Sequence, residues 1–316
     1  MNPYVFFVGS ARSGTTLLQR LADAHPELAV IQETLWITRF HERRKGLTAE
    51  AFATPKLVEQ LLANRRFLRL GLDPADLGPL LDGGRRPYAD FVTGVFDLYG
   101  RAQGKPLVGD KSPGYVRSIP TLHALWPDAR FVHLIRDGRD VALSALSWRK
   151  ADKVFRDFRG YADDPWTTAA LWWERSVRLG REAAATLPPP LYAEVRYEAL
   201  VADPERECRR LCVFLGLPYD GAMLRFHEGR TRADAALPSK RRWLPPTQGL
   251  RDWRTDMSRE AVERFEAAAG PMLEELGYPR GVSRPSPGSL ERASAALRVF
   301  SEDVRTRRRP LPEEWT

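Results

Sequence analysis

The chain has 316 residues, 43% hydrophobic and 28% charged, which supports a substantial core and excludes a disordered or a small disulfide-stapled protein. Its 49 Lys and Arg residues exceed the 41 Asp and Glu residues, and the net charge of +8 favours anionic partners such as nucleotides or nucleic acids. No apolar stretch approaches the roughly 20 residues that a membrane-spanning helix needs.

The first element is a short apolar run at residues 4–8, which ends at Gly9 and leads through a loop into a segment with helical spacing. This order of strand, loop and helix is typical of the start of an α/β domain. We predict further strands at residues 29–31, 130–135 and 191–195, each followed or preceded by a helical segment. The alternation predicts a three-layer α/β/α fold with a mainly parallel central sheet. The sequence shows no internal repeats.

Residues 39–105 are mostly helical in pattern, and we interpret them as a cap inserted over the sheet within a single domain of residues 1–280. Residues 227–254 are basic and poor in apolar side chains, which is typical of a long functional loop. Residues 281–316 are predicted to be a C-terminal helical arm or tail, either docked on the domain or frayed.

Cys208 and Cys212 lie four residues apart in a helical pattern, so they share one face and are interpreted as core residues. One helical turn is a poor geometry for a disulfide, and two ligands do not make a zinc site. Because the sequence shows neither a disulfide framework nor a leader-like pattern at its start, we expect a cytoplasmic protein. We also expect a bacterial one.

The loop GSARSGTT has the features of an anion site. Main-chain N–H groups at such a turn hold phosphate or sulfate at the start of a helix, aided by the helix dipole. The spacing nearly matches the Walker pattern, but Thr15 occupies the position of the Walker lysine, and Arg12 offers a replacement cation. The alternative interpretation is an ordinary glycine-rich turn between a strand and a helix.

Several segments in the same order resemble the PAPS-dependent sulfotransferases, over residues 3–279: GSARSGTTLL, HPEL with QETLW, GDKSP, LIRDGRDVALSALSW, and RYEALVADPE before CVFLGL. The resemblance implies a P-loop NTPase-like fold and a site for 3′-phosphoadenosine-5′-phosphosulfate (PAPS). The residues that it assigns to the 5′-phosphosulfate are Arg12, Ser13, Gly14, Thr15 and Thr16. It assigns Arg136 and Ser144 to the 3′-phosphate and Tyr197 to the adenine, and a looser match in the basic loop suggests Ser239 and Arg242.

Arg136 and Ser144 would lie about 12 Å apart along a continuous helix, so both can reach one phosphate only if the chain turns between them. Asp137 and Gly138 allow such a turn, and we expect the helix to begin near Arg139 or Asp140.

The resemblance also assigns the reacting groups. Cytosolic steroid and phenol enzymes of the family have a histidine two residues after a lysine, and this chain has none after Lys111. It is more similar to the tyrosylprotein and carbohydrate branch, which implies Glu33 as general base and Lys111, with Arg12, as the cations on the leaving oxygen. The alternatives are a capping or salt-bridged carboxylate for Glu33, and a surface pairing with Asp110 for Lys111.

The sequence therefore predicts a sulfotransferase that moves the sulfuryl group of PAPS in line to a hydroxyl of a small molecule, lipid or sugar. No metal is expected, because no carboxylate cluster is evident and the transferred group carries less charge than a phosphoryl group. A protein-tyrosine acceptor is disfavoured by the missing secretory signal, no nucleic-acid partner is expected, and an oligomer is possible. One alternative is a P-loop kinase-like phosphotransferase, which is disfavoured because this chain lacks the Walker lysine. The other is a non-catalytic nucleic-acid-binding protein, which is disfavoured because the chain has no recognised binding motif.

Overall fold

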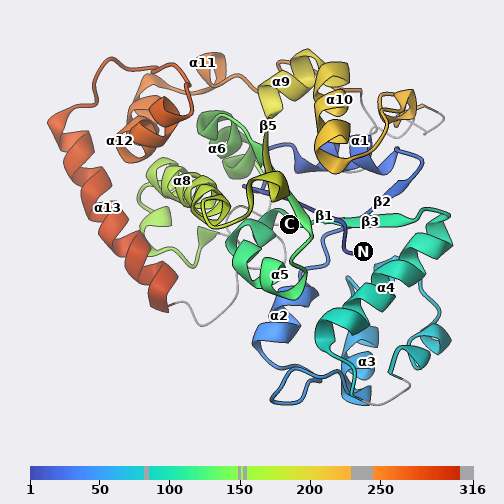
Figure 1. Cartoon of the computed structure of the whole chain (residues 1–316). Helices are drawn as coiled ribbons and strands as arrows, with labels where there is room; N and C mark the ends of the chain where they lie inside the picture. The colour runs from blue at the N-terminus through green and yellow to red at the C-terminus, as the bar shows by residue number, and fades with distance from the viewer. Residues whose placement is uncertain (82–84, 149–150, 152–154, 229–244, 307–316) are drawn as a thin grey trace.

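A computed structural model describes residues 1–81, 85–148, 151, 155–228 and 245–306 (Figure 1). Its central sheet has the strand order β2-β3-β1-β4-β5, and every pairing in it is parallel. The strands are β1 (Val5–Gly9), β2 (Leu28–Gln32), β3 (Leu107–Lys111), β4 (Arg130–Ile135) and β5 (Tyr192–Arg196). The prediction of a mainly parallel sheet is confirmed.

Helices make up most of the rest of the described chain. The α-helices are α1 (Thr15–Asp23), α2 (Trp36–Glu42), α3 (Pro55–Leu62), α4 (Tyr88–Gln103), α5 (Ile119–Leu125), α6 (Gly138–Leu146), α8 (Pro165–Ala184), α9 (Tyr197–Ala202), α10 (Pro204–Leu215), α11 (Trp253–Asp256), α12 (Arg259–Glu275) and α13 (Pro287–Thr306). Short 3-10 turns include η1 (Leu68–Leu70), η4 (Pro113–Arg117) and η5 (Arg159–Tyr161). None of the described helices is long and apolar enough to cross a membrane.

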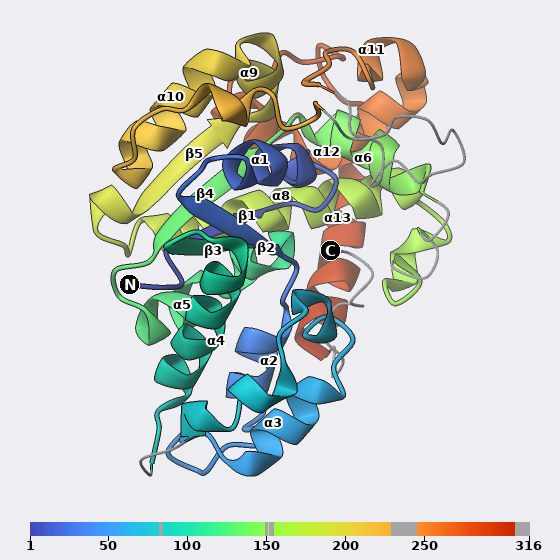
Figure 2. The same ribbon diagram turned by 90° about the vertical axis from the view of Figure 1, so that its right-hand side faces the viewer.

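The helices cover both faces of the sheet, and the two views show three layers (Figures 1 and 2). On one face, α1, α9 and α10 pack against Val5, Phe7 and Val132. On the other face, α4, α5 and the end of α8 pack against Phe6 and Phe131. The three-layer α/β/α prediction is therefore confirmed, and its cause is that side chains along each strand alternate between the two faces.

The cysteines lie in the layer of α10. Both Cys208 and Cys212 are buried free thiols, as predicted, and burial raises the pKa of Cys208 to about 12. Thiols of this kind act as small apolar side chains in a core.

Strand β3 was not predicted. Its sequence LVGDK has two apolar residues followed by Gly109, Asp110 and Lys111, and the charged pair does not read as a buried strand. In the structure both charged side chains are fully buried, and Lys111 lies beside Phe7 of β1 and Gln32 of β2 in the register of the sheet. In the sheet, β3 lies between β1 and β2, and it carries one of the candidate catalytic residues, Lys111.

The region predicted as a cap packs on the sheet through a shared core. Trp36 of α2, Leu57 of α3 and Phe91 of α4 belong to the same apolar cluster as Phe6 of β1. At the other end of the chain, α13 packs against α12 and α8, and its Phe300 ring stacks on Phe158 with 4.8 Å between centroids. The C-terminal helical arm is α13, and it is docked on the domain through α12 and α8.

Candidate functional site

The carboxyl ends of the five parallel strands bring the candidate residues to one edge of the sheet. In α/β sheets this edge is where ligands bind. Each strand ends at or just before one candidate: Arg12 after β1, Glu33 after β2, Lys111 at the end of β3, Arg136 after β4 and Tyr197 after β5. Residues from five separate segments are therefore neighbours because the strands run the same way.

The loop between β1 and α1 is held close to its surroundings by its glycines. A Cβ atom at Gly14, whose φ is 98°, would lie 2.4 Å from the Tyr197 ring, and one at Gly9 would lie 2.5 Å from the main-chain oxygen of Leu134. Helix α1 has no side-chain cap, so the N–H groups of its first turn are left for another acceptor. The hydroxyl of Ser13 is buried and has no hydrogen-bond partner among the described residues. The loop can therefore surround an anion with unpaired donors.

Arg12 has a left-handed main chain, with φ 73°, and its side chain turns toward α6. Its Nε donates to the Ser144 hydroxyl over 3.2 Å, and its guanidinium lies 5.7 Å from the centre of the Trp148 ring. Burial lowers the pKa of Arg12, and the nearby Arg251 and Arg136 lower it further. This concentration of positive charge favours an anionic ligand, and it links the loop to Ser144 directly.

Glu33 and Lys111 form a buried ion pair. Lys111 Nζ donates to Glu33 Oε1 over 2.8 Å, and the two side chains are 0% and 6% exposed. The main-chain N–H of Glu33 also donates to the Lys111 carbonyl oxygen over 2.9 Å. The described structure therefore pairs Lys111 with Glu33, not with Asp110 at the surface.

Arg66 also contacts Glu33, although no motif in the sequence points to it. Its NH1 donates to the Glu33 main-chain oxygen over 3.0 Å and to Oε2 over 3.3 Å. Arg66 follows α3 in the cap, in a run with two arginines and no motif, so no sequence signal distinguishes it from Arg65.

Asp110 precedes Lys111 in β3 and is fully buried. Burial raises the pKa of its carboxyl to about 6, although the Thr34 main-chain N–H that donates to Oδ2 over 3.2 Å opposes the rise. A raised carboxyl pKa means that the folded state binds the proton more tightly than the unfolded state between about pH 4 and pH 6.

Asp110→Asn should therefore change how stability depends on pH. In the wild-type protein, ionisation of Asp110 lowers the free energy of unfolding as the pH rises through this window, by up to about 1.4 kcal/mol per pH unit. The asparagine variant should lose this contribution. Urea unfolding of both proteins from pH 4 to pH 7 measures the difference, and parallel curves would contradict the buried, protonatable carboxyl.

Arg136 is positioned by an aromatic ring and a carboxylate. Its guanidinium lies 4.3 Å from the centre of the Tyr197 ring, and NH2 pairs with Asp140 Oδ2 over 3.3 Å. Its Nε is buried without a partner among the described residues. Asp140 also accepts a hydrogen bond from the Trp253 main-chain N–H over 2.9 Å, so the start of α11 joins the site.

The expected turn after Arg136 is present, and the helix that follows it begins one residue before Arg139, the earlier of the two expected starts. Helix α6 begins at Gly138, and the Asp137 side chain caps it by accepting from the Arg139 N–H over 3.0 Å. Arg139 is fully buried and pairs with both Asp137 and Glu266. This network supports the segment next to Arg136, and no motif in the sequence points to it.

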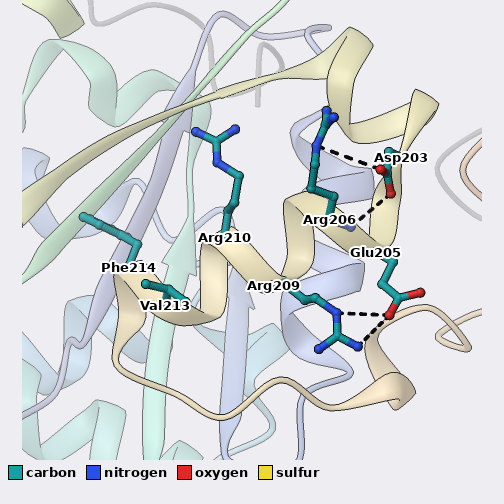
Figure 3. A pocket seen from close by; sticks show the side chains of 7 residues that line it. All are labelled: Asp203, Glu205, Arg206, Arg209, Arg210, Val213 and Phe214. Carbon is teal, nitrogen blue, oxygen red and sulfur yellow. Dashed lines mark hydrogen bonds and ion pairs between the residues drawn. The ribbon is translucent and has the colours of Figure 1, made fainter.

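Two candidates, Ser239 and Arg242, lie outside the described residues. The pocket in Figure 3 lies along α10 and is lined by none of the candidate site residues; Asp203, Glu205, Arg206, Arg209, Arg210, Val213 and Phe214 line it. Its arginines are partly engaged, since Arg206 pairs with Asp203 and Arg209 with Glu205. No group of three or more His, Cys, Asp or Glu side chains that could hold a metal occurs in the described part of the chain.

Comparisons with known proteins identify the family of the chain. Residues 3–221 match the model of the Sulfotransferase family. The chain is 26% identical to protein-tyrosine sulfotransferase A of Caenorhabditis elegans over 96% of this chain and 73% of that protein, and 28% identical to protein-tyrosine sulfotransferase 1 of Danio rerio over 92% and 77%.

Two solved structures share the fold. The sulfotransferase domain from the Synechococcus PCC 7002 olefin synthase aligns with a TM-score of 0.58 and 24% identity over 87% of this chain and 94% of that one. The sulfotransferase domain from the curacin biosynthetic pathway aligns with a TM-score of 0.51 and 18% identity over 93% and 97%.

The comparisons correct the expectation of a bacterial, cytoplasmic protein, because the curated relatives are protein-tyrosine sulfotransferases of animals. The cytoplasmic part of that expectation depended on the cysteines and on the first residues of the sequence. Cys208 and Cys212 pack inside the core, where a thiol behaves as an apolar group, so their free state carries no information on the compartment.

Proposed function

The chain belongs to the sulfotransferase family, and from this premise we propose that it transfers the sulfuryl group of PAPS to a hydroxyl group at the carboxyl edge of the sheet. The observation that carries the proposal is the buried ion pair between Glu33 and Lys111 at the ends of β2 and β3, on one side of β1 and the loop of Arg12. A carboxylate and a cation so placed can serve the proton and the leaving group of one transfer.

The residues present fit PAPS as the donor substrate. The uncapped start of α1 and the unpaired Ser13 hydroxyl supply donors for the 5′-phosphosulfate. The unpaired Nε of Arg136 supplies a donor for the 3′-phosphate, and Tyr197, whose ring the Arg136 guanidinium contacts, is the aromatic residue that we assign to the adenine. Ser144, whose hydroxyl accepts from Arg12 Nε, joins the loop to α6.

The proposed reaction assigns one task to each charged group. Glu33 accepts the proton of the attacking hydroxyl as the new S–O bond forms. Lys111 and Arg12 stabilise the negative charge on the phosphate oxygen as its bond to sulfur breaks. Lys111 must then shift part of its contact from Glu33 to that oxygen, which leaves Glu33 Oε1 open to the acceptor.

The acceptor is a hydroxyl, and its class is a matter for screening. The curated relatives are named for protein tyrosine, so tyrosyl peptides belong in the screen with small-molecule, lipid and sugar hydroxyls.

A thermal-shift titration without magnesium tests the donor site. Adenosine 3′,5′-bisphosphate at 100 times its Kd should stabilise the protein by about 2.7 kcal/mol, more than equal concentrations of 5′-AMP or ATP. Arg136→Ala should weaken binding of the bisphosphate and leave 5′-AMP binding unchanged. The exposed Arg206→Ala is the control.

Two results would contradict these assignments. Preferential stabilisation by ATP would favour a phosphotransferase over a sulfotransferase reaction. Equal weakening of both nucleotides in Arg136→Ala would remove Arg136 from the 3′-phosphate site.

A further inference from the structure

Arg66 reaches the candidate base from the cap, not from the sheet. It lies between α3 and η1, in a turn that Asn64 fixes: Asn64 Oδ1 accepts from the main-chain N–H of Arg66 over 2.9 Å and from that of Phe67 over 3.2 Å. Phe67 is buried and packs its ring edge-on against Trp36, with 5.6 Å between centroids. The main chain at Arg66 is thus held on both sides, and its side chain is only 10% exposed.

One guanidinium nitrogen contacts two different parts of Glu33. NH1 of Arg66 donates to the main-chain oxygen over 3.0 Å and to the carboxylate Oε2 over 3.3 Å. Glu33 has φ 59°, in the left-handed region that residues with a Cβ rarely adopt. A donor that bonds both the main chain and the carboxylate stabilises this unusual conformation and the direction of the side chain together.

The two carboxylate oxygens of Glu33 therefore have different partners. Oε1 faces Lys111 from the sheet, and Oε2 faces Arg66 from the cap. The third cation near Glu33 is Arg12, whose guanidinium is close enough for electrostatic interaction with the carboxylate. If Lys111 turns to the leaving oxygen during transfer, Arg66 still holds Oε2 and keeps Oε1 directed at the acceptor.

We propose that Arg66 is a positioning residue for Glu33, so that the cap sets the orientation and the ionisation of the catalytic base. This inference rests on the proposed function, since it gives Arg66 a task in the same transfer. It also means that an acceptor bound against the cap can influence the base through the turn at residues 64–67.

The test compares Arg66→Met, Arg66→Lys and the control Arg65→Met, whose arginine is exposed and precedes Arg66 in the same turn. Loss of the Arg66 cation should lower kcat by about 10-fold or more, with little change in the KM for PAPS. It should also move the acidic limb of the kcat profile to higher pH by about one unit, because the cation favours the ionised carboxylate.

Arg66→Lys separates charge from geometry. It should restore the position of the acidic limb and recover only part of kcat, because an ammonium cannot reproduce the fixed donor geometry of a guanidinium. A fall in kcat with an unmoved acidic limb in Arg66→Met would overturn the proposal, and so would a control variant that behaves in the same way. If Arg66→Met does not fold, Arg66→Gln tests the same loss of charge.

A double-mutant comparison distinguishes failure of this inference from failure of the proposed function. In a Glu33→Gln background, Arg66→Met should lower turnover no further, since its effect passes through Glu33. Wild-type protein that binds the bisphosphate but transfers no sulfuryl group to any acceptor class would contradict the proposed function. Normal wild-type transfer together with additive effects of the two substitutions would overturn the role of Arg66 alone.

Discussion

Replacing Glu33 by glutamine is expected to lower turnover by about 10²-fold or more and to leave binding of adenosine 3′,5′-bisphosphate unchanged. Glutamine has nearly the same shape and can still accept from Lys111, but it cannot take a proton from the attacking hydroxyl. The Glu33 side chain is only 6% exposed and pairs with Lys111 over 2.8 Å. Because bulk water has little access to this position, it does not readily replace the carboxylate as base.

The measurement is the steady-state rate of sulfuryl transfer, with thermal shift by the bisphosphate as the check on folding. Glu59→Gln is the matched control, because Glu59 is an exposed carboxylate of α3 in the cap. Unchanged turnover in Glu33→Gln would remove Glu33 from the mechanism, and the buried carboxylate would then be a structural partner of Lys111 and Arg66.

Replacing Arg139 by methionine is expected to lower the free energy of unfolding by about 3–5 kcal/mol, which is typical when one partner of a buried ion network is removed. Arg139 is fully buried and donates to Asp137 Oδ2 over 2.7 Å and to Glu266 Oε1 over 2.6 Å. Its guanidinium also lies 3.5 Å from the centre of the Trp253 ring. Without Arg139, the carboxylates of Asp137 and Glu266 lose the cation between them, and Glu266 keeps only the longer contact with Arg280, 3.9 Å from Oε2.

The consequence extends beyond α6. Glu266 of α12 also accepts from the main-chain N–H of Gly281 over 2.7 Å, so the network ties the sheet edge to the segment that leads to α13. Urea unfolding measures the effect, and Arg178→Met on the exposed side of α8 should change stability by less than about 0.5 kcal/mol. A loss below about 1 kcal/mol in Arg139→Met would mean that the network is solvated and contributes little.

Most of the sheet could be predicted because apolar runs identify buried strands. Residues 4–8, 29–31, 130–135 and 191–195 all fall in strands or within one residue of them. Strand β3 could not be predicted because Asp110 and Lys111 are charged, and a charged residue reads as exposed unless its partner is known. The partner of Lys111 is 78 residues away in the sequence.

The sequence by itself determined the loop at the start of α1, the alternation of strands and helices, and hence the edge where the candidate residues meet. These features are local: hydrophobic periodicity and glycine spacing act over a few residues, and parallel strands necessarily align their carboxyl ends. Only the tertiary structure decided which charges pair, as Glu33 with Lys111 and Arg66, and Arg139 with Glu266. A buried ion needs a partner at a few ångströms, and that distance is set by the packing of whole elements, not by any pattern along the chain.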